Sequence, residues 1–135
     1  YAKSVDRNNL RRLIRPLEVI LTTGEKFSEL QKKEKRKFKF FKIGIIEERE
    51  KLYEKIDQRV DEQLKMGLLE ETISLAKDYS YELKSMSGLG YKQIGCFLRG
   101  ELSFEDAILV LKRDTRHFAK RQLTWWRKDQ EIIWV

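Results

Sequence analysis

Apolar residues recur at helical spacing along most of this chain, and the clearest run lies near its C-terminus. No Gly or Pro interrupts residues 103–127, so we predict one long helix there, with Ser103 as its N-cap and Asp106 three positions later. At roughly 100° per residue, one face of this helix is apolar and is expected to enter a core. That face carries Phe104, Ile108, Leu111, Phe118 and Trp126, and the opposite face carries Arg113, Arg116, Lys120, Thr124 and Arg127.

The same periodicity predicts four further helices, over residues 6–23, 47–66, 68–78 and 91–98. Pro16 falls inside the first of them, where it either kinks the helix or delays its regular part. The polar segments 25–37 and 79–86 are interpreted as connections, the first as an exposed linker, and residues 87–90 as a flexible glycine loop.

Residues 38–46 change to aromatic and β-branched side chains, which indicates a strand, and residues 132–135 are the only other strand candidate. The first run is apolar at nearly every position toward its end, as in a parallel sheet covered on both faces. Because two strands alone make a marginal sheet, we predict a mostly helical α/β fold that is part of one larger domain. This chain, which starts with Tyr, would contribute one central strand and a short terminal strand to a parallel sheet of the P-loop type.

Composition adds a preference for polyanions. The chain of 135 residues has a net charge of +7 and a pI near 9.5, and residues 47–82 hold half of its acids. It shows neither a signal-peptide pattern nor an apolar run of membrane-spanning length, so a soluble, cytoplasmic monomer without a membrane partner is expected. Cys96 is alone and is interpreted as a small buried thiol, and His117 as a surface histidine.

Two basic patches stand out. Residues 112–128 hold seven Lys or Arg and one acid, Asp114, so their helix lacks the usual i,i+4 acidic partners and is interpreted as a phosphate-binding face. The second patch is Arg7, Arg11, Arg12 and Arg15. For each patch the alternative is a solvated helix face, which is also our interpretation of the acids in residues 47–61.

Aromatic side chains near these patches could stack on bases. Tyr91 follows the glycine loop, and Trp125 and Trp126 end the long helix. Trp126 lies on the apolar side and is interpreted as core, whereas Trp125 fits a core or a stacking role equally well.

Several segments resemble the C-terminal half of the tRNA dimethylallyltransferase (tRNA isopentenyltransferase) family. They are residues 6–19, 52–61 and 90–92 and above all AKRQLTWWR at 119–127. The resemblance implies an enzyme that transfers a dimethylallyl group from its diphosphate to the exocyclic amine of the adenosine 3′ to the anticodon. In that family a P-loop of the ATP-binding type, with Mg²⁺, binds the diphosphate, and an Asp is the base. Both belong to the N-terminal half; no GxxxxGK[ST] occurs here, so no catalytic residue is assigned and this chain alone is expected to be inactive.

The resemblance implies dimethylallyl diphosphate and the tRNA anticodon stem-loop as partners. Residues expected to bind tRNA are Arg11, Arg12, Leu13, Ile14, Arg15, Ser87, Gly88, Leu89, Gly90, Tyr91, Lys92, Arg113, Arg116, Lys120, Arg121, Gln122, Leu123, Thr124, Trp125, Trp126 and Arg127. Lys55 and Arg59 fall where the family has basic residues, and either bind the diphosphate or form a salt bridge within their helix.

Two alternatives remain open. One is the branch of the family that prenylates free adenine nucleotides, which predicts no dependence on tRNA. The other is a non-catalytic RNA-binding adaptor that retains the recognition surface without the chemistry.

Overall fold

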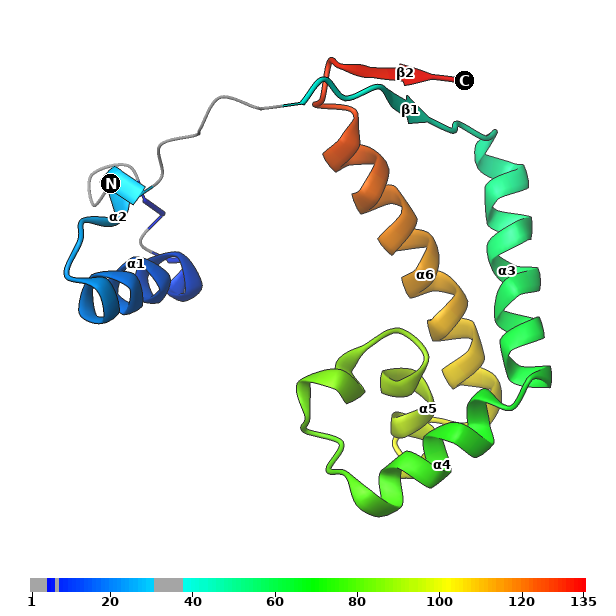
Figure 1. Ribbon diagram of the computed structural model, residues 1–135. Helices are drawn as coiled ribbons and strands as arrows, with labels where there is room; N and C mark the ends of the chain where they lie inside the picture. The colour runs from blue at the N-terminus through cyan, green and yellow to red at the C-terminus, as the bar shows by residue number, and fades with distance from the viewer. Residues whose placement is uncertain (1–4, 7, 31–37) are drawn as a thin grey trace. The chain divides into compact units, whose positions relative to one another are not determined.

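The computed structural model describes residues 5–6, 8–30 and 38–135, and the chain divides into two compact units, Tyr1–Phe40 and Phe41–Val135 (Figure 1). In the first unit, helix α1 (Leu10–Thr23) is followed by the short helix α2 (Phe27–Leu30). The linker predicted over residues 25–37 is therefore partly helical, and residues 31–37 lie outside the described residues.

Helix α1 begins at its cap and not at residue 6. The Asn9 side-chain oxygen accepts the backbone N–H of Arg12 at 3.2 Å, and Gly24 ends the helix with φ 72°. Pro16 is buried within α1, which already runs from Leu10. The expectation that the regular helix starts late because of Pro16 is therefore wrong, since the Asn9 cap starts it earlier and one missing backbone bond does not stop it.

The second unit contains the other predicted elements. In chain order they are β1 (Lys42–Gly44), α3 (Arg49–Lys65), α4 (Leu68–Asp78), the 3₁₀ helix η1 (Lys84–Ser87), α5 (Tyr91–Leu98), α6 (Phe104–Trp126) and β2 (Ile132–Trp134). The four helices are confirmed to within a few residues, whereas the strand predicted over residues 38–46 is shorter and the connection at 79–86 runs into η1.

Strands β1 and β2 pair in parallel, with Lys42 opposite Ile132 and Gly44 opposite Trp134, which confirms the mostly helical α/β fold. Lys42 fixes this pairing at one end, because its ammonium group bonds Asp129 at 2.6 Å and Glu131 at 2.7 Å. At the other end the absence of a side chain at Gly44 lets the strands approach. A Cβ there would lie 2.5 Å from the Trp134 ring.

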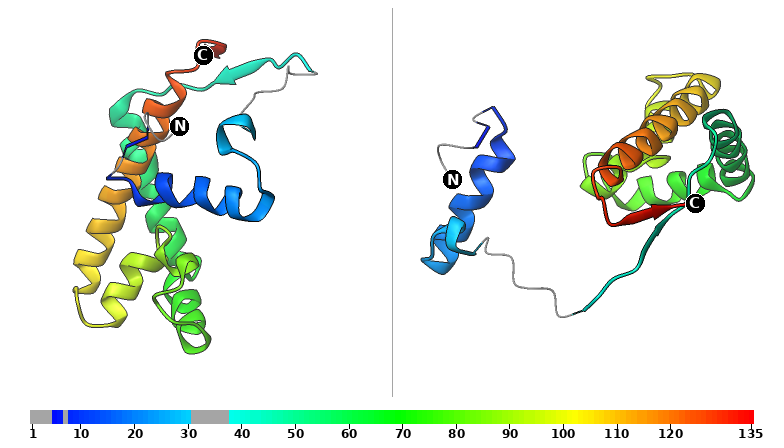
Figure 2. Two further views of the ribbon diagram at one scale, coloured as in Figure 1. Left: turned by 90° about the vertical axis from the view of Figure 1, so that its left-hand side faces the viewer. Right: turned by 90° about the horizontal axis from the view of Figure 1, so that it is seen from above.

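The hydrophobic core lies where α3, α5 and the first half of α6 meet, at the opposite end of the long helices from the sheet (Figures 1 and 2). Its buried apolar side chains are Ile56, Val60, Met86, Ile94, Ala107 and Leu111. The predicted apolar stripe of α6 therefore enters the core only in its first half. Phe118 and Trp126 are 44% and 50% exposed, so their assignment to the core is wrong for the described residues.

Among the described helices, none has the length and apolar character of a membrane-spanning segment.

Candidate nucleic-acid interface

Helix α6 carries more of the residues predicted to bind tRNA than any other element, and its capped first turn sets its direction. The Ser103 hydroxyl oxygen accepts the Asp106 backbone N–H at 3.0 Å, and Glu105 and Asp106 place negative charge at the positive end of the helix dipole. The helix then runs to Trp126 beside α3 (Figure 2). Two cations of this helix, Lys112 and Arg116, lie against α3.

In the first part of the helix the cations form ion pairs with carboxylates. Lys112 pairs with Asp61 at 2.6 Å, Arg113 with Asp114 at 3.1 Å, and Arg116 with Asp57. The helix has no i,i+4 acidic partners for Lys112 and Arg116, as expected, but both cations are already paired with acids of another helix. Their partners are acids of α3, which the sequence analysis interprets as a solvated face. The spacing of residues within one helix does not indicate which helix lies beside it.

The end of α6 remains cationic. Lys120, Arg121, Arg127 and Lys128 form no ion pair with a carboxylate of the described residues, and the guanidinium of Arg121 lies 5.8 Å from the centroid of the Phe118 ring. Trp125 is 72% exposed in the same segment, so it is a surface residue there and is available to stack. The interpretation of this segment as anion-binding thus keeps its physical basis, although over a shorter stretch than predicted.

A cleft of about 310 Å³ lies between this part of α6 and the start of α3. We call it the cationic cleft. Its polar lining comprises Glu47, Arg49, Tyr53, Lys120, Thr124 and Arg127, and Leu52 and Leu123 complete it. Glu47, the carboxylate of the cleft, accepts a hydrogen bond from Lys55. The three cations that line the cleft, Arg49, Lys120 and Arg127, have no carboxylate partner among the described residues.

Arg49 is a cleft residue that the sequence analysis missed. Its Nε donates to the Tyr53 hydroxyl at 3.2 Å, and its guanidinium lies 5.2 Å from the Tyr53 ring centroid. Arg116 approaches the same ring at 5.3 Å, so Tyr53 lies close to two guanidinium groups. The i,i+4 spacing of Arg49 and Tyr53 was the one available signal, and it could not indicate that α6 lies opposite.

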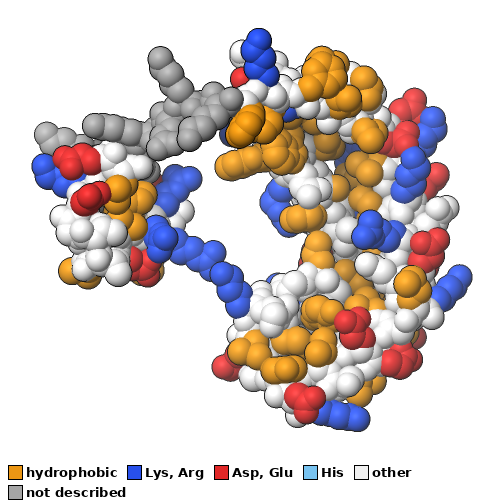
Figure 3. Space-filling view, viewed as in Figure 1, with side chains coloured by type: hydrophobic (Ala, Val, Ile, Leu, Met, Phe, Trp, Pro, Cys, Tyr) orange, Lys and Arg blue, Asp and Glu red, His pale blue; other side chains and the backbone are white. Residues whose placement is uncertain are grey.

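An apolar groove of about 750 Å³ adjoins the sheet. Hydrophobic side chains gather over this part of the molecule in Figure 3, and those lining the groove include Ile43, Ile45, Leu123, Trp126 and Trp134. Gln122 also lines the groove, so the AKRQLTWWR segment supplies residues to both hollows.

The two residues predicted to bind diphosphate lie one turn apart on α3, but only Lys55 lines the apolar groove. Lys55 lines the apolar groove, where it donates to Glu47, a residue just before α3, and this hydrogen bond lowers the pKa of Glu47. Arg59 is exposed one turn further along α3 and does not line the groove. The salt-bridge alternative therefore describes Lys55 better, although its partner lies outside the helix.

The glycine loop is the second predicted contact in this unit. Residues 87–90 lead into α5, with Leu89 exposed and Gly90 at φ 95°, in the region that favours glycine. Tyr91 is half-buried and its hydroxyl donates to Glu71 of α4 at 2.8 Å, which raises the pKa of Tyr91. The Tyr91 ring is therefore held against α4, while Lys92 is exposed beside it.

Arg11, Arg12, Leu13, Ile14 and Arg15 all lie on α1, in the other unit. The three arginines are exposed, Arg15 pairs with Glu18 at 3.2 Å, and Ile14 is 50% exposed. Arg7, the fourth arginine of this patch, lies outside the described residues.

The two other reactive side chains have ordinary surroundings. His117 is exposed, as predicted. Cys96 is half-buried, less than predicted, and its Sγ lies 3.5 Å from Arg99 Nη2. Burial raises the pKa of Cys96. The described residues contain no group of three or more His, Cys, Asp or Glu placed to hold a metal ion.

Fold and surface together define a mostly helical α/β protein with a cationic end to its longest helix. Comparison with known proteins places it more closely: the chain belongs to the IPP transferase family, whose model matches residues 1–129. It is 44% identical to a tRNA dimethylallyltransferase of Lachnoclostridium phytofermentans and 42% identical to one of Thermotoga maritima. These alignments cover 99% and 98% of this chain but 44% of each relative, so the chain spans less than half of their length.

Solved structures agree with this assignment. The tRNA isopentenylpyrophosphate transferase of Bacillus halodurans matches with a TM-score of 0.71 and 36% identity, over 99% of this chain and 41% of that one. The tRNA delta(2)-isopentenylpyrophosphate transferase of Staphylococcus epidermidis matches with a TM-score of 0.69 and 33% identity, over 99% and 45%. The family resemblance of the sequence is thus confirmed.

Proposed function

We propose that this chain is the tRNA-binding portion of an enzyme that transfers a dimethylallyl group from dimethylallyl diphosphate to the exocyclic amine of the adenosine 3′ to the anticodon. The observation that carries this proposal is the cationic cleft, in which Arg49, Lys120 and Arg127 lack carboxylate partners among the described residues. The names of the relatives, which are tRNA dimethylallyltransferases, supply the substrate class.

The chemistry of the cleft suits an RNA backbone. Guanidinium and ammonium groups bind phosphate oxygens, and Thr124 lies in the same cleft, although its hydroxyl donates to the Lys120 carbonyl at 2.9 Å. Exposed Trp125 on the same helix offers a ring face to an unstacked base. Phosphate contacts would hold the anticodon stem, and stacking would stabilise a loop whose target adenosine has left its stack.

The transfer itself needs groups that this chain does not supply. The exocyclic amine attacks the allylic carbon, the bond from that carbon to the diphosphate oxygen breaks, and a base takes the proton from the amine. We propose that the diphosphate, its Mg²⁺ and the base belong to the part of the relatives that this chain does not cover, and that this chain alone is inactive. We further propose a cytoplasmic monomer.

The test is binding of the full chain to anticodon stem-loop RNA, measured by fluorescence anisotropy against a DNA hairpin of equal length. We expect the RNA to bind more tightly, and the variant Lys120→Ala/Arg127→Ala to lose most of that preference. A matched control is Lys65→Ala/Lys77→Ala, which removes two exposed cations from α3 and α4. Failure to bind RNA together with tight binding of AMP would support the alternative of a free-nucleotide prenyltransferase. RNA binding by a full-length gene product that transfers no prenyl group would support the adaptor.

A further inference from the structure

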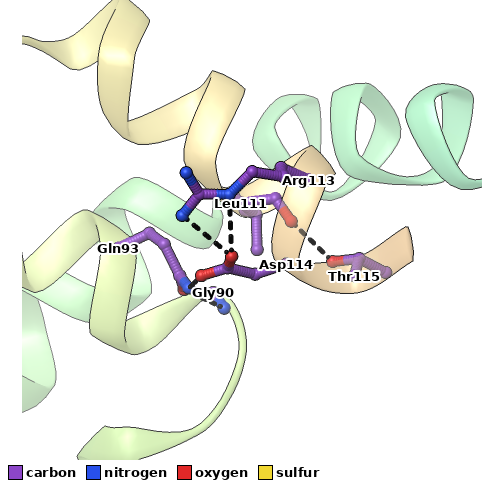
Figure 4. Close-up of polar contacts among 6 residues, drawn as sticks. All are labelled: Gly90, Gln93, Leu111, Arg113, Asp114 and Thr115. Atoms are coloured by element: carbon purple, nitrogen blue, oxygen red, sulfur yellow. Dashed lines mark hydrogen bonds and ion pairs between the residues drawn. The ribbon is translucent and has the colours of Figure 1, made fainter. Parts of the chain in front are cut away.

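A buried amide connects the glycine loop to α6. Gln93, in the first turn of α5, is 2% exposed, and both ends of its side chain are bonded (Figure 4). Its Oε1 accepts the Gly90 backbone N–H at 3.1 Å, and its Nε2 donates to Asp114 Oδ2 at 2.9 Å. A polar side chain this deeply buried would cost stability without such partners, so the position requires a group that both accepts and donates.

Asp114 carries the connection onward to the surface. Its Oδ1 accepts from both Nε and Nη2 of Arg113, each at 3.1 Å. Burial acts to raise the pKa of Asp114, but the amide of Gln93, the guanidinium of Arg113 and the charge of Lys92 outweigh it, and the pKa lies below its ordinary value. Asp114 is therefore ionised at neutral pH, and an unbroken series of hydrogen bonds runs from the loop backbone to a guanidinium on α6.

These hydrogen bonds connect the segments that carry two exposed cations, one on α5 and one on α6. Lys92 follows the glycine loop in sequence and is exposed, and the Arg113 side chain is 61% exposed. Apolar side chains at positions 93 and 114 could fill the same space, but they could bond neither the Gly90 N–H nor Arg113. The bond between buried Gln93 and half-buried Asp114 is thus explained by what it orients and not by packing alone.

We propose that Gln93 and Asp114 are positioning residues that hold the glycine loop against α6, so that Lys92 and Arg113 meet RNA phosphates at a fixed spacing. The proposal rests on the proposed function, because it concerns the binding of the same RNA. Neither residue needs to touch the RNA.

The test exchanges the amide and the carboxylate. Gln93→Glu sets two carboxylates facing each other, and Asp114→Asn sets two amide NH₂ groups facing each other or frees the Gly90 N–H. The double variant Gln93→Glu/Asp114→Asn restores the pattern with its polarity reversed. The carboxylate now at position 93 would accept from the Gly90 N–H and from the amide now at position 114, and the oxygen of that amide would still accept from Arg113. The double variant also keeps the net charge of the original chain.

Two quantities are measured in the full chain, at a temperature at which every variant is folded. They are the affinity for anticodon stem-loop RNA and, without RNA, the hydrogen-exchange rate of the Gly90 amide. Each single variant is expected to lose about tenfold in affinity and to exchange faster at Gly90, since each breaks a hydrogen bond of a charged group. The double variant is expected to return to within about threefold of the original affinity.

Charge alone predicts the opposite result for one variant. Asp114→Asn makes the protein more positive, so tighter RNA binding would follow from electrostatics without positioning. Glu105→Gln removes an exposed acid from the same helix and is the matched control, expected to bind at least as tightly as the original chain.

Three outcomes would overturn the proposal: single variants that bind RNA as the original does, variants that lose stability without losing affinity, or a double variant that binds more weakly than either single one. If the original chain bound no RNA, the proposed function would fail. Exchange at Gly90 in the same variants would then decide whether the pair fixes the loop.

Discussion

Arg116 of α6 and Asp57 of α3, 59 positions apart in sequence, form a two-point ion pair, with Nε 3.1 Å from Oδ1 and Nη2 bonded to Oδ2. Their side chains are 35% and 30% exposed, so the pair is only partly screened by water. It joins α3 and α6 outside the buried core. Arg116 was predicted to bind tRNA, but its charge is already committed to α3.

Removal of either partner is expected to lower the free energy of unfolding and to have a smaller effect on the affinity for RNA. Arg116→Ala and Asp57→Ala should each cost about 1 kcal/mol of unfolding free energy, because each leaves a half-buried charge without its partner. Urea denaturation of both single variants and the double variant measures this. A double variant no less stable than either single one indicates coupling, and strictly additive losses would show that the pair contributes nothing.

Lys120 and Arg127 should behave in the opposite way. Because no described carboxylate pairs with them, Lys120→Ala and Arg127→Ala should each change unfolding free energy by less than about 0.5 kcal/mol. Each should also reduce the slope of log affinity against log salt by about 0.7 to 0.9 for one lost phosphate contact. Anisotropy titrations with stem-loop RNA at several salt concentrations measure the slope, with Lys77→Ala as the unaffected control. An unchanged slope in both variants would place the RNA elsewhere.

Gly44 should not tolerate a side chain. An added Cβ would lie 2.5 Å and 2.7 Å from Trp134 ring atoms and 2.8 Å from Ile132 Cγ2, so Gly44→Ala should cost about 1 to 3 kcal/mol and loosen the strand pairing. Unfolding followed by tryptophan fluorescence reports both effects. Gly88→Ala is the control, since its φ is −65° and its nearest contact is 3.4 Å. Equal stability of the two variants would contradict the close approach of the strands.

Acid stability should depend on Glu101. Hydrogen bonds from Arg99, at 2.6 Å and 3.0 Å, and a contact with Cys96 lower the pKa of Glu101 from 4.5 to about 2. Between about pH 2 and pH 4.5 the unfolded chain therefore binds more protons at Glu101 than the folded chain does. The contribution of Glu101 to stability is complete above about pH 4.5 and is lost as the pH falls toward 2. Glu101→Gln should make the loss of unfolding free energy over this range shallower, as measured by denaturation at a series of pH values. Glu54→Gln, an exposed acid on α3, should leave it unchanged.

Local sequence patterns predicted the positions of the helices well, but they predicted poorly which side chains of different helices are in contact. The spacing of Ile56 and Val60 located α3 and its buried face, and Ser103 located the start of α6, because both signals depend only on residues a turn apart. The pairing of Lys112 with Asp61 depends on how α3 and α6 meet, which periodicity does not contain.

The same limit applies to the candidate site: its sequence motif was predictable, but the placement of its side chains was not. AKRQLTWWR was recognised as a unit, yet the structure distributes its side chains between the cationic cleft, the apolar groove and open solvent. Trp126 lies on the apolar side of its helix by spacing but is half exposed, since that end of α6 extends beyond α5. Arg49 and Gln93 were missed because each acquires its role from a residue on another helix.

The parallel pairing of β1 with β2 has a consequence for the order of folding. Lys42 and Asp129, which bond beside this sheet, are 87 positions apart, so closing the chain between them costs ~4 kcal/mol of loop entropy. The contacts of α5 with α6 join segments much closer in sequence and need no such closure. The helical part should therefore assemble first, and the strands, with few residues to offset the cost, should meet last and separate first.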